Sequence, residues 1–108
     1  MYESIRGDLE LIQKSILEST PVEAIYLFGS HAYGMPHRDS DLDIYVVIPD
    51  SGADDFVELS ADIRGRLYKK KTRSMDLLIG KSSVFAQRRQ APATIEREVA
   101  QKGVRLYG

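Results

Sequence analysis

The stretch that decides the fold is LFGSHAYGMPHRDSDLDIYVV, residues 27–47. It places Asp41 and Asp43 one residue apart at the start of an apolar run that continues to Ile48. Because side chains two residues apart in a strand project to the same face, we expect both carboxylates to point together. Like charges so close repel each other, and burial raises the cost, unless a cation lies between them. The stretch therefore predicts a charged site at the mouth of a buried strand.

A third aspartate stands at the head of another apolar run. Asp76 lies in MDLLIG, residues 75–80, and would join Asp41 and Asp43 if the two strands were neighbours. Three carboxylates without Cys or His suit Mg²⁺ or Mn²⁺ rather than zinc. Two such ions form the clamp used for in-line displacement at phosphorus. An isolated Asp-x-Asp is more often a turn or a solvated edge, and a calcium loop is excluded because its required Gly and Glu are missing.

The Gly29-Ser30 pair directly follows the apolar run AIYLF, residues 24–28. Glycine lets the backbone approach a phosphate closely, and free N–H groups with a serine hydroxyl can hold it. Alone, the pair predicts only a turn. A strand, Gly-Ser and then Asp-x-Asp on the next strand together predict a triphosphate between an anion cradle and a metal site. The P-loop and dinucleotide-binding fingerprints are absent.

Hydrophobic periodicity predicts alternating helices and strands in one α/β domain, residues 1–108. Strands are expected at 24–28, 42–48 and 75–79, without a derivable order. A weaker helical stretch, 83–101, is interrupted by Pro92. Two stronger helices are indicated by apolar residues at helical spacing: Ile5, Leu9, Ile12 and Ile16, then Phe56, Leu59, Ile63 and Leu67.

Composition narrows the function classes. Fifteen basic residues balance sixteen acidic ones, so no net field favours nucleic acid or a membrane surface. The chain has no cysteine, which excludes disulfides and thiolate metal sites. No segment approaches the roughly 20 apolar residues of a membrane span, and the acidic N-terminal stretch does not resemble a signal peptide. A cytoplasmic location is expected.

The spacing of these motifs resembles a known signature. GS, ten residues and DLD, followed by SMDLLIG and the closing EREVAQKGVRLYG, resemble the minimal nucleotidyltransferases of the DNA-polymerase-β-like superfamily. The resemblance implies a small mixed β-sheet with helices packed against it. It also implies transfer of a nucleoside monophosphate from a nucleoside triphosphate, with pyrophosphate leaving.

The resemblance also assigns roles to single residues. Gly29 and Ser30 would hold the β- and γ-phosphates. Asp41 and Asp43 would bind both of two Mg²⁺ ions, with Mn²⁺ as a substitute, and Asp76 the ion that activates the attacking hydroxyl. All three aspartates are thus the expected catalytic residues.

Many members of this family are antitoxins that attach AMP from ATP to a tyrosine of a HEPN-domain toxin, which implies such a partner here. The chain departs from the family in the loop. Family members often carry arginines at the positions of His31, Tyr33 and His37, and proline at that of Arg38. Arg38 is the compensating cation expected at the nucleotide. The roles of the other three stay open, although a loop histidine is more often solvated.

Two further functions compete with a protein-modifying nucleotidyltransferase. One is a binding module that neutralises a partner by contact and keeps a vestigial site; the three intact acids favour activity instead. The other is modification of an antibiotic, which is disfavoured because 108 residues leave little room for an acceptor-binding domain. The sequence specifies neither the acceptor nor the preferred triphosphate, and it leaves an oligomer possible.

Overall fold

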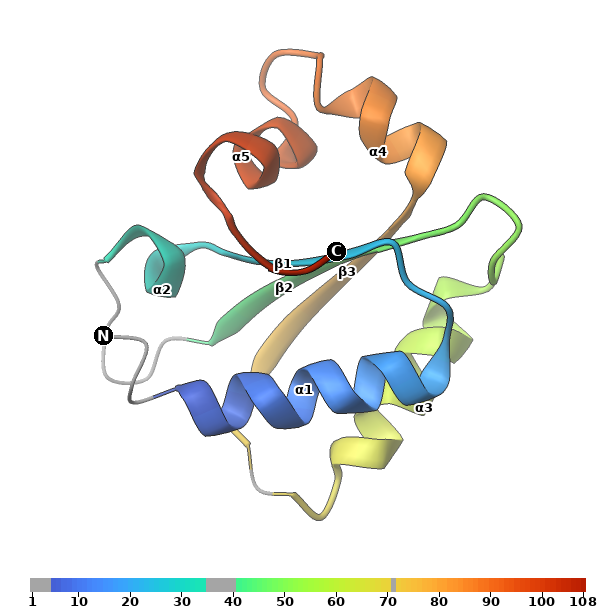
Figure 1. Ribbon diagram of the computed structural model, residues 1–108, viewed down its shortest axis with the longest axis vertical. Coiled ribbons are helices and arrows are strands. Elements are labelled where there is room, and N and C mark those ends of the chain that lie inside the picture. The colour runs from blue at the N-terminus through green and yellow to red at the C-terminus, as the bar shows by residue number, and fades with distance from the viewer. Residues whose placement is uncertain (1–4, 35–40, 71) are drawn as a thin grey trace.

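A computed structural model describes residues 5–34, 41–70 and 72–108. These residues form a four-stranded mixed sheet with helices packed against it (Figure 1). The strands are β1 (Ala24–Phe28), β2 (Leu42–Ile48), β3 (Met75–Lys81) and β4 (Val104–Tyr107). The helices are α1 (Arg6–Ser19), α2 (Ser30–Tyr33), α3 (Phe56–Leu67), α4 (Ser82–Arg88) and α5 (Ile95–Lys102). The predicted α/β class and the three predicted strands are confirmed.

The strand order is β3-β2-β1-β4. β1 runs antiparallel to both β2 and β4, whereas β2 and β3 are parallel. Parallel neighbours need a crossover connection, which α3 supplies between them. The register pairs Leu42 with Met75 and Asp43 with Asp76, so the charged beginnings of the two strands coincide.

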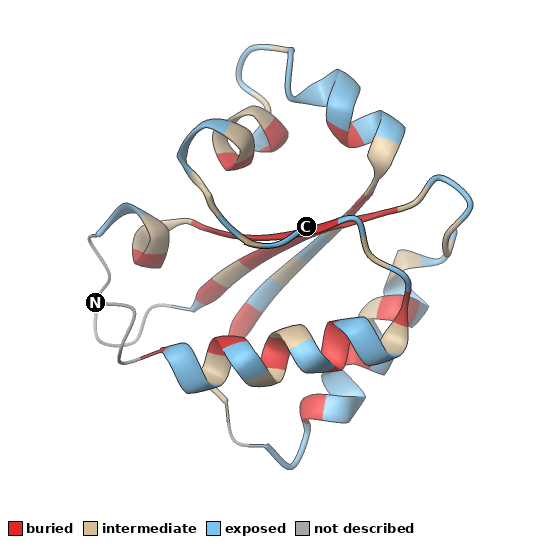
Figure 2. Cartoon of the chain, in the orientation of Figure 1, coloured by how far each residue is buried: buried red, intermediate tan, exposed pale blue. Residues whose placement is uncertain are grey.

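One face of the sheet is covered by α1 and α3, as the ribbon shows (Figure 1). Side chains from both helices and from alternate strand positions form the larger core, and the inward helix faces are buried (Figure 2). Alternation along β2 explains this division, because Leu42, Ile44 and Val46 all point to that face. Phe56 of the predicted stripes is partly buried against this core, and the other members are buried there: Ile5, Leu9, Ile12, Ile16, Leu59, Ile63 and Leu67.

The other face is covered by α4 and α5 and has a smaller, more aromatic core. The Phe85 ring of α4 lies 5.6 Å from the Tyr26 ring and 5.2 Å from the Tyr45 ring, centroid to centroid. Val99 of α5 completes this cluster. Asp43 belongs to the same face as Tyr45, so the candidate site opens beside this second layer.

The helical stretch at 83–101 is divided into α4 and α5, as Pro92 predicts. Thr94 begins α5 as an N-cap, because its side-chain oxygen accepts a hydrogen bond from the Arg97 amide at 3.1 Å. Among the described residues, no helix has the length and apolar character that crossing a bilayer requires.

Candidate active site

The site centres on Asp43, which lies between two other elements. The sheet register places Asp43 opposite Phe28 of β1 on one side and Asp76 of β3 on the other. Gly29, the residue after β1, has φ +76°, and a Cβ there would overlap the Asp43 carboxylate. Glycine is therefore required at this position by both backbone conformation and space. The predicted proximity of Gly-Ser and Asp-x-Asp is present in the fold.

Negative charge is concentrated at this point. Burial raises the pKa of the Asp43 carboxyl group, and Asp76 raises it further through its charge and a side-chain hydrogen bond. The charge of Asp41 acts in the same direction, while His31 partly opposes it. Asp41 itself is exposed and precedes β2. The arrangement is one that a cation would stabilise.

The donors at this point are carboxylate oxygens, which fit Mg²⁺ or Mn²⁺ better than zinc. Asp43 and Asp76 are opposite each other in the sheet register and interact through their charges and a side-chain hydrogen bond. Within residues 5–34, 41–70 and 72–108, however, no three His, Cys, Asp or Glu side chains are grouped closely enough to hold a metal ion. The three-aspartate metal site therefore stays a prediction.

The Gly-Ser turn opens directly into α2. The amides of Ala32 and Tyr33 donate to the Gly29 carbonyl at 3.0 and 3.1 Å, and Ser30 is the first helical residue. Gly34, with φ +82°, ends the helix after one turn. The chain is therefore helical directly after the Gly-Ser turn.

His31 is not the solvated loop histidine that we expected. It lies in α2, is only 4% exposed, and interacts electrostatically with Asp43. The expectation is wrong because the single turn of α2 directs this side chain inward. His37 and Arg38 lie outside the described residues, so the assignment of Arg38 to the nucleotide stays a prediction.

Tyr33 lies beside α5, which sequence reasoning did not connect to the site. The Lys102 ammonium is 6.0 Å from the centroid of the Tyr33 ring. Burial raises the pKa of the Tyr33 hydroxyl, and a hydrogen bond and the charge of Glu98 add to this. Glu98 and Lys102 are four residues apart, so their shared helical face was visible in the sequence, but its contact with α2 was not.

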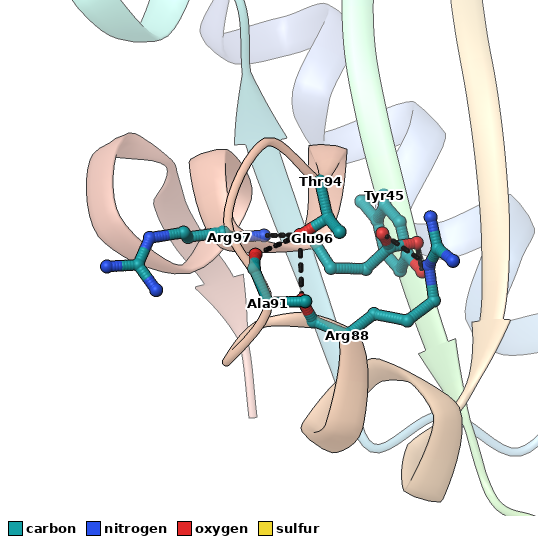
Figure 3. A network of polar contacts seen from close by, with 6 residues as sticks. All are labelled: Tyr45, Arg88, Ala91, Thr94, Glu96 and Arg97. Carbon is teal, nitrogen blue, oxygen red and sulfur yellow. Dashed lines mark hydrogen bonds and ion pairs between the residues drawn. The ribbon is translucent and has the colours of Figure 1, made fainter.

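A buried polar network ties the second helical layer to β2 (Figure 3). The Tyr45 hydroxyl donates to Glu96 Oε2 at 2.8 Å, and Arg88 Nε donates to Glu96 Oε1 at 2.9 Å. Gly80 faces the Tyr45 hydroxyl, and a Cβ there would overlap it. The network attaches α4 and α5 to β2 at Tyr45, which lies two residues after Asp43 on that strand. Sequence reasoning missed it, because Tyr45 gave no sign of being more than a core residue.

Comparison with known proteins agrees with this geometry. Residues 10–108 match the family described as "Polymerase beta, Nucleotidyltransferase". A comparison with curated proteins finds no match.

Two solved structures resemble the chain over most of its length. The first, titled "Crystal structure of the toxin-antitoxin with AMP-PNP", has a TM-score of 0.61 and 27% identity, covering 92% of this chain and 72% of the other. The second is a mutant of the toxin-antitoxin pair MntA-HpeT, with a TM-score of 0.55 and 24% identity, covering 95% and 72%. At that identity the second shows the fold alone.

Proposed function

Because the chain belongs to the polymerase beta nucleotidyltransferase family, we propose that it acts as an antitoxin, transferring AMP from ATP to a hydroxyl group of a partner toxin. The observation that carries the proposal is the position of Asp43, between the Gly29 turn and Asp76. The likeness to a toxin-antitoxin structure with AMP-PNP supports an adenine nucleotide and a toxin partner. A HEPN-domain toxin with a tyrosine acceptor, in the cytoplasm, is the specific form we propose.

The reaction would be an in-line displacement at phosphorus. The acceptor oxygen attacks the α-phosphorus of ATP, the bond from that phosphorus to the bridging oxygen of the β-phosphate breaks, and pyrophosphate leaves. The hydroxyl proton passes to solvent. When bound, Mg²⁺ or Mn²⁺ supplies the positive charge that screens the triphosphate and lowers the pKa of the acceptor hydroxyl.

Each residue of the proposed site would have a different role in the reaction. Gly29 gives the triphosphate close access to the backbone, and the Ser30 hydroxyl binds its terminal phosphates. Asp41 and Asp43 hold both ions and so anchor the nucleotide. Asp76, on the neighbouring strand, would hold the ion that lowers the pKa of the acceptor hydroxyl. This division predicts different consequences for loss of Asp43 and Asp76.

The test measures labelled AMP transferred from ATP to a co-purified toxin. Asp76→Asn is expected to leave ATP affinity within a few-fold while turnover falls by about 10²-fold or more, the scale of losing one transition-state stabiliser. Asp43→Asn is expected to lower both. Asp62→Asn, on the exposed side of α3, is the matched control and should change neither.

Two results would contradict the proposal. Equal ATP affinity in EDTA and in Mg²⁺ would exclude the metal-bridged nucleotide, because carboxylates repel a triphosphate in the absence of cations. A wild-type protein that silences its partner but labels it under no metal or triphosphate would be a binding module instead.

A further inference from the structure

The outer edge of β3 is unpaired in the part of the chain that the structure describes, where β3 pairs with β2 alone. The Leu42 amide donates to the Ser74 carbonyl at 2.9 Å, so by alternation the amides of Asp76, Leu78 and Gly80 face β2. Those of the intervening residues face outward. Arg64 Nη2 donates to the outward carbonyl of Met75 at 3.1 Å, at one end of this edge. Its central part is a template for another strand.

The side of α3 along this edge carries an unusual apolar surface. Val57 and Tyr68 are 82% and 84% exposed, the highest values among the large hydrophobic residues described. With Ala61 and Arg64 they recur at intervals of four, three and four residues, which places them on one helical face. Arg64 contacts β3, so this face borders the strand edge.

A groove accompanies the edge at each end. One, of about 380 Å³, lies between Val57 and residues 77–79. The other, of about 150 Å³, lies between Tyr68 and Met75. Each groove thus holds one of the two exposed side chains, and a two-fold axis through the middle of β3 would bring the Val57 end of one copy to the Tyr68 end of another.

Charge along α3 selects the same arrangement. Asp54, Asp55 and Glu58 stand at the start of the helix, whereas the end of the helix and the residues after it are basic: Arg64, Arg66, Lys69 and Lys70. Antiparallel helices from two copies would place opposite charges together, and parallel ones would place like charges together. The surface is therefore complementary to itself.

We propose that two copies of this chain pair through β3, antiparallel, with the two-fold axis at Leu78, the midpoint of the strand. The paired strands would form one continuous sheet, with the α3 helices side by side on one face. The proposed dimer surface is separate from the proposed active site, so the failure of one proposal would not contradict the other.

Cysteine cross-linking tests the register. Because the Leu78 amide faces β2, Leu78 would meet its symmetry mate in a non-hydrogen-bonded pair, with Cα atoms about 4.5 Å apart. That separation allows a disulfide, and the natural chain has no cysteine to compete. Leu78→Cys should give a covalent dimer on mild oxidation. Arg105→Cys, on the other edge strand β4, is the matched control and should not.

Sedimentation tests the surface. The wild-type chain should dimerise with rising concentration, and Val57→Asp should raise the dissociation constant at least tenfold without altering the thermal midpoint of the monomer. Leu17→Asp, on the exposed side of α1, should leave the dissociation constant unchanged. A wild-type chain that stays monomeric at millimolar concentration overturns the proposal. Cross-linking of the Arg105→Cys variant without cross-linking of Leu78→Cys also overturns it. The same holds if the β3 edge binds the toxin but no second copy of this chain.

Discussion

The two faces of the sheet are built for different purposes. The face under α1 and α3 carries the larger apolar core, in which Ile44 is fully buried. The face under α4 and α5 holds Asp43, Asp76 and the Tyr45–Glu96 hydrogen bond beside its aromatic cluster. Since β2 contributes alternate residues to both faces, one strand supplies the core and the site together. The difference teaches that alternate residues of a single strand can serve the core and a candidate site.

The largest effect is expected on the apolar face. Ile44→Ala removes a fully buried side chain and leaves a cavity, which should lower the free energy of unfolding by about 2–5 kcal/mol. Chemical denaturation measures this. Val84→Ala, a truncation of an exposed side chain of α4 in the opposite layer, is the control and should cost much less. Equal decreases in the free energy of unfolding for the two variants would show that the apolar face does not contribute more to stability than the opposite layer.

A smaller effect of opposite sign is expected at the site. Asp43→Asn removes a carboxylate that Asp76 and Asp41 repel, so it should raise the free energy of unfolding in EDTA, by less than about 1 kcal/mol because solvent screens the repulsion. Saturating Mg²⁺ and ATP should stabilise the wild type more than the variant. Thermal unfolding with and without these ligands measures both. A variant less stable than wild type in EDTA would assign Asp43 a structural role.

The smallest effect concerns the polar network and depends on pH. Burial alone would raise the pKa of Glu96, but hydrogen bonds from Arg88 and Tyr45 outweigh it and hold the pKa below its ordinary value of 4.5. The charged form is therefore favoured by folding, and its contribution to stability is present above pH 4.5 and lost as pH falls through the lowered pKa. Glu96→Gln should show a shallower loss of stability in acid. Urea denaturation at a series of pH values below 4.5 measures this. If the free energy of unfolding falls equally steeply with pH in wild type and variant, the network does not stabilise the fold in this way.

Much of the fold could be predicted because hydrophobic spacing is a local signal. The stripes Ile5–Ile16 and Phe56–Leu67 and the runs at 24–28 and 42–48 each indicate their element without reference to the rest of the chain. Strand order is not local. β4 lies near the end of the chain and pairs with β1 near its beginning, and its four residues are too few to show a strand periodicity.

The site was predictable to the same extent. Gly29, Asp43 and Asp76 could be expected to meet because a strand, Gly-Ser and an Asp-x-Asp on the next strand occur in that order, although each element alone indicates only a turn or a solvated edge. The inward position of His31 and the approach of Glu98 to Tyr33 could not, because both depend on how a short helix packs against a distant one. The sequence also predicts that three carboxylates come together at a metal site. Among the described residues, no such group of three is found.

The position of β3 at the sheet edge has a consequence for the lifetime of the site. In the monomer, β3 has one neighbouring strand and opens locally at lower free energy than β2, which has two. Each opening would carry Asp76 away while the β1–β2 hairpin kept Gly29 and Asp43 in place. The proposed nucleotide-binding residues Gly29 and Asp43 would thus stay together through fluctuations that displace Asp76. Amide hydrogen exchange should be faster in β3 than in β2, and equal protection would exclude this intermittent site.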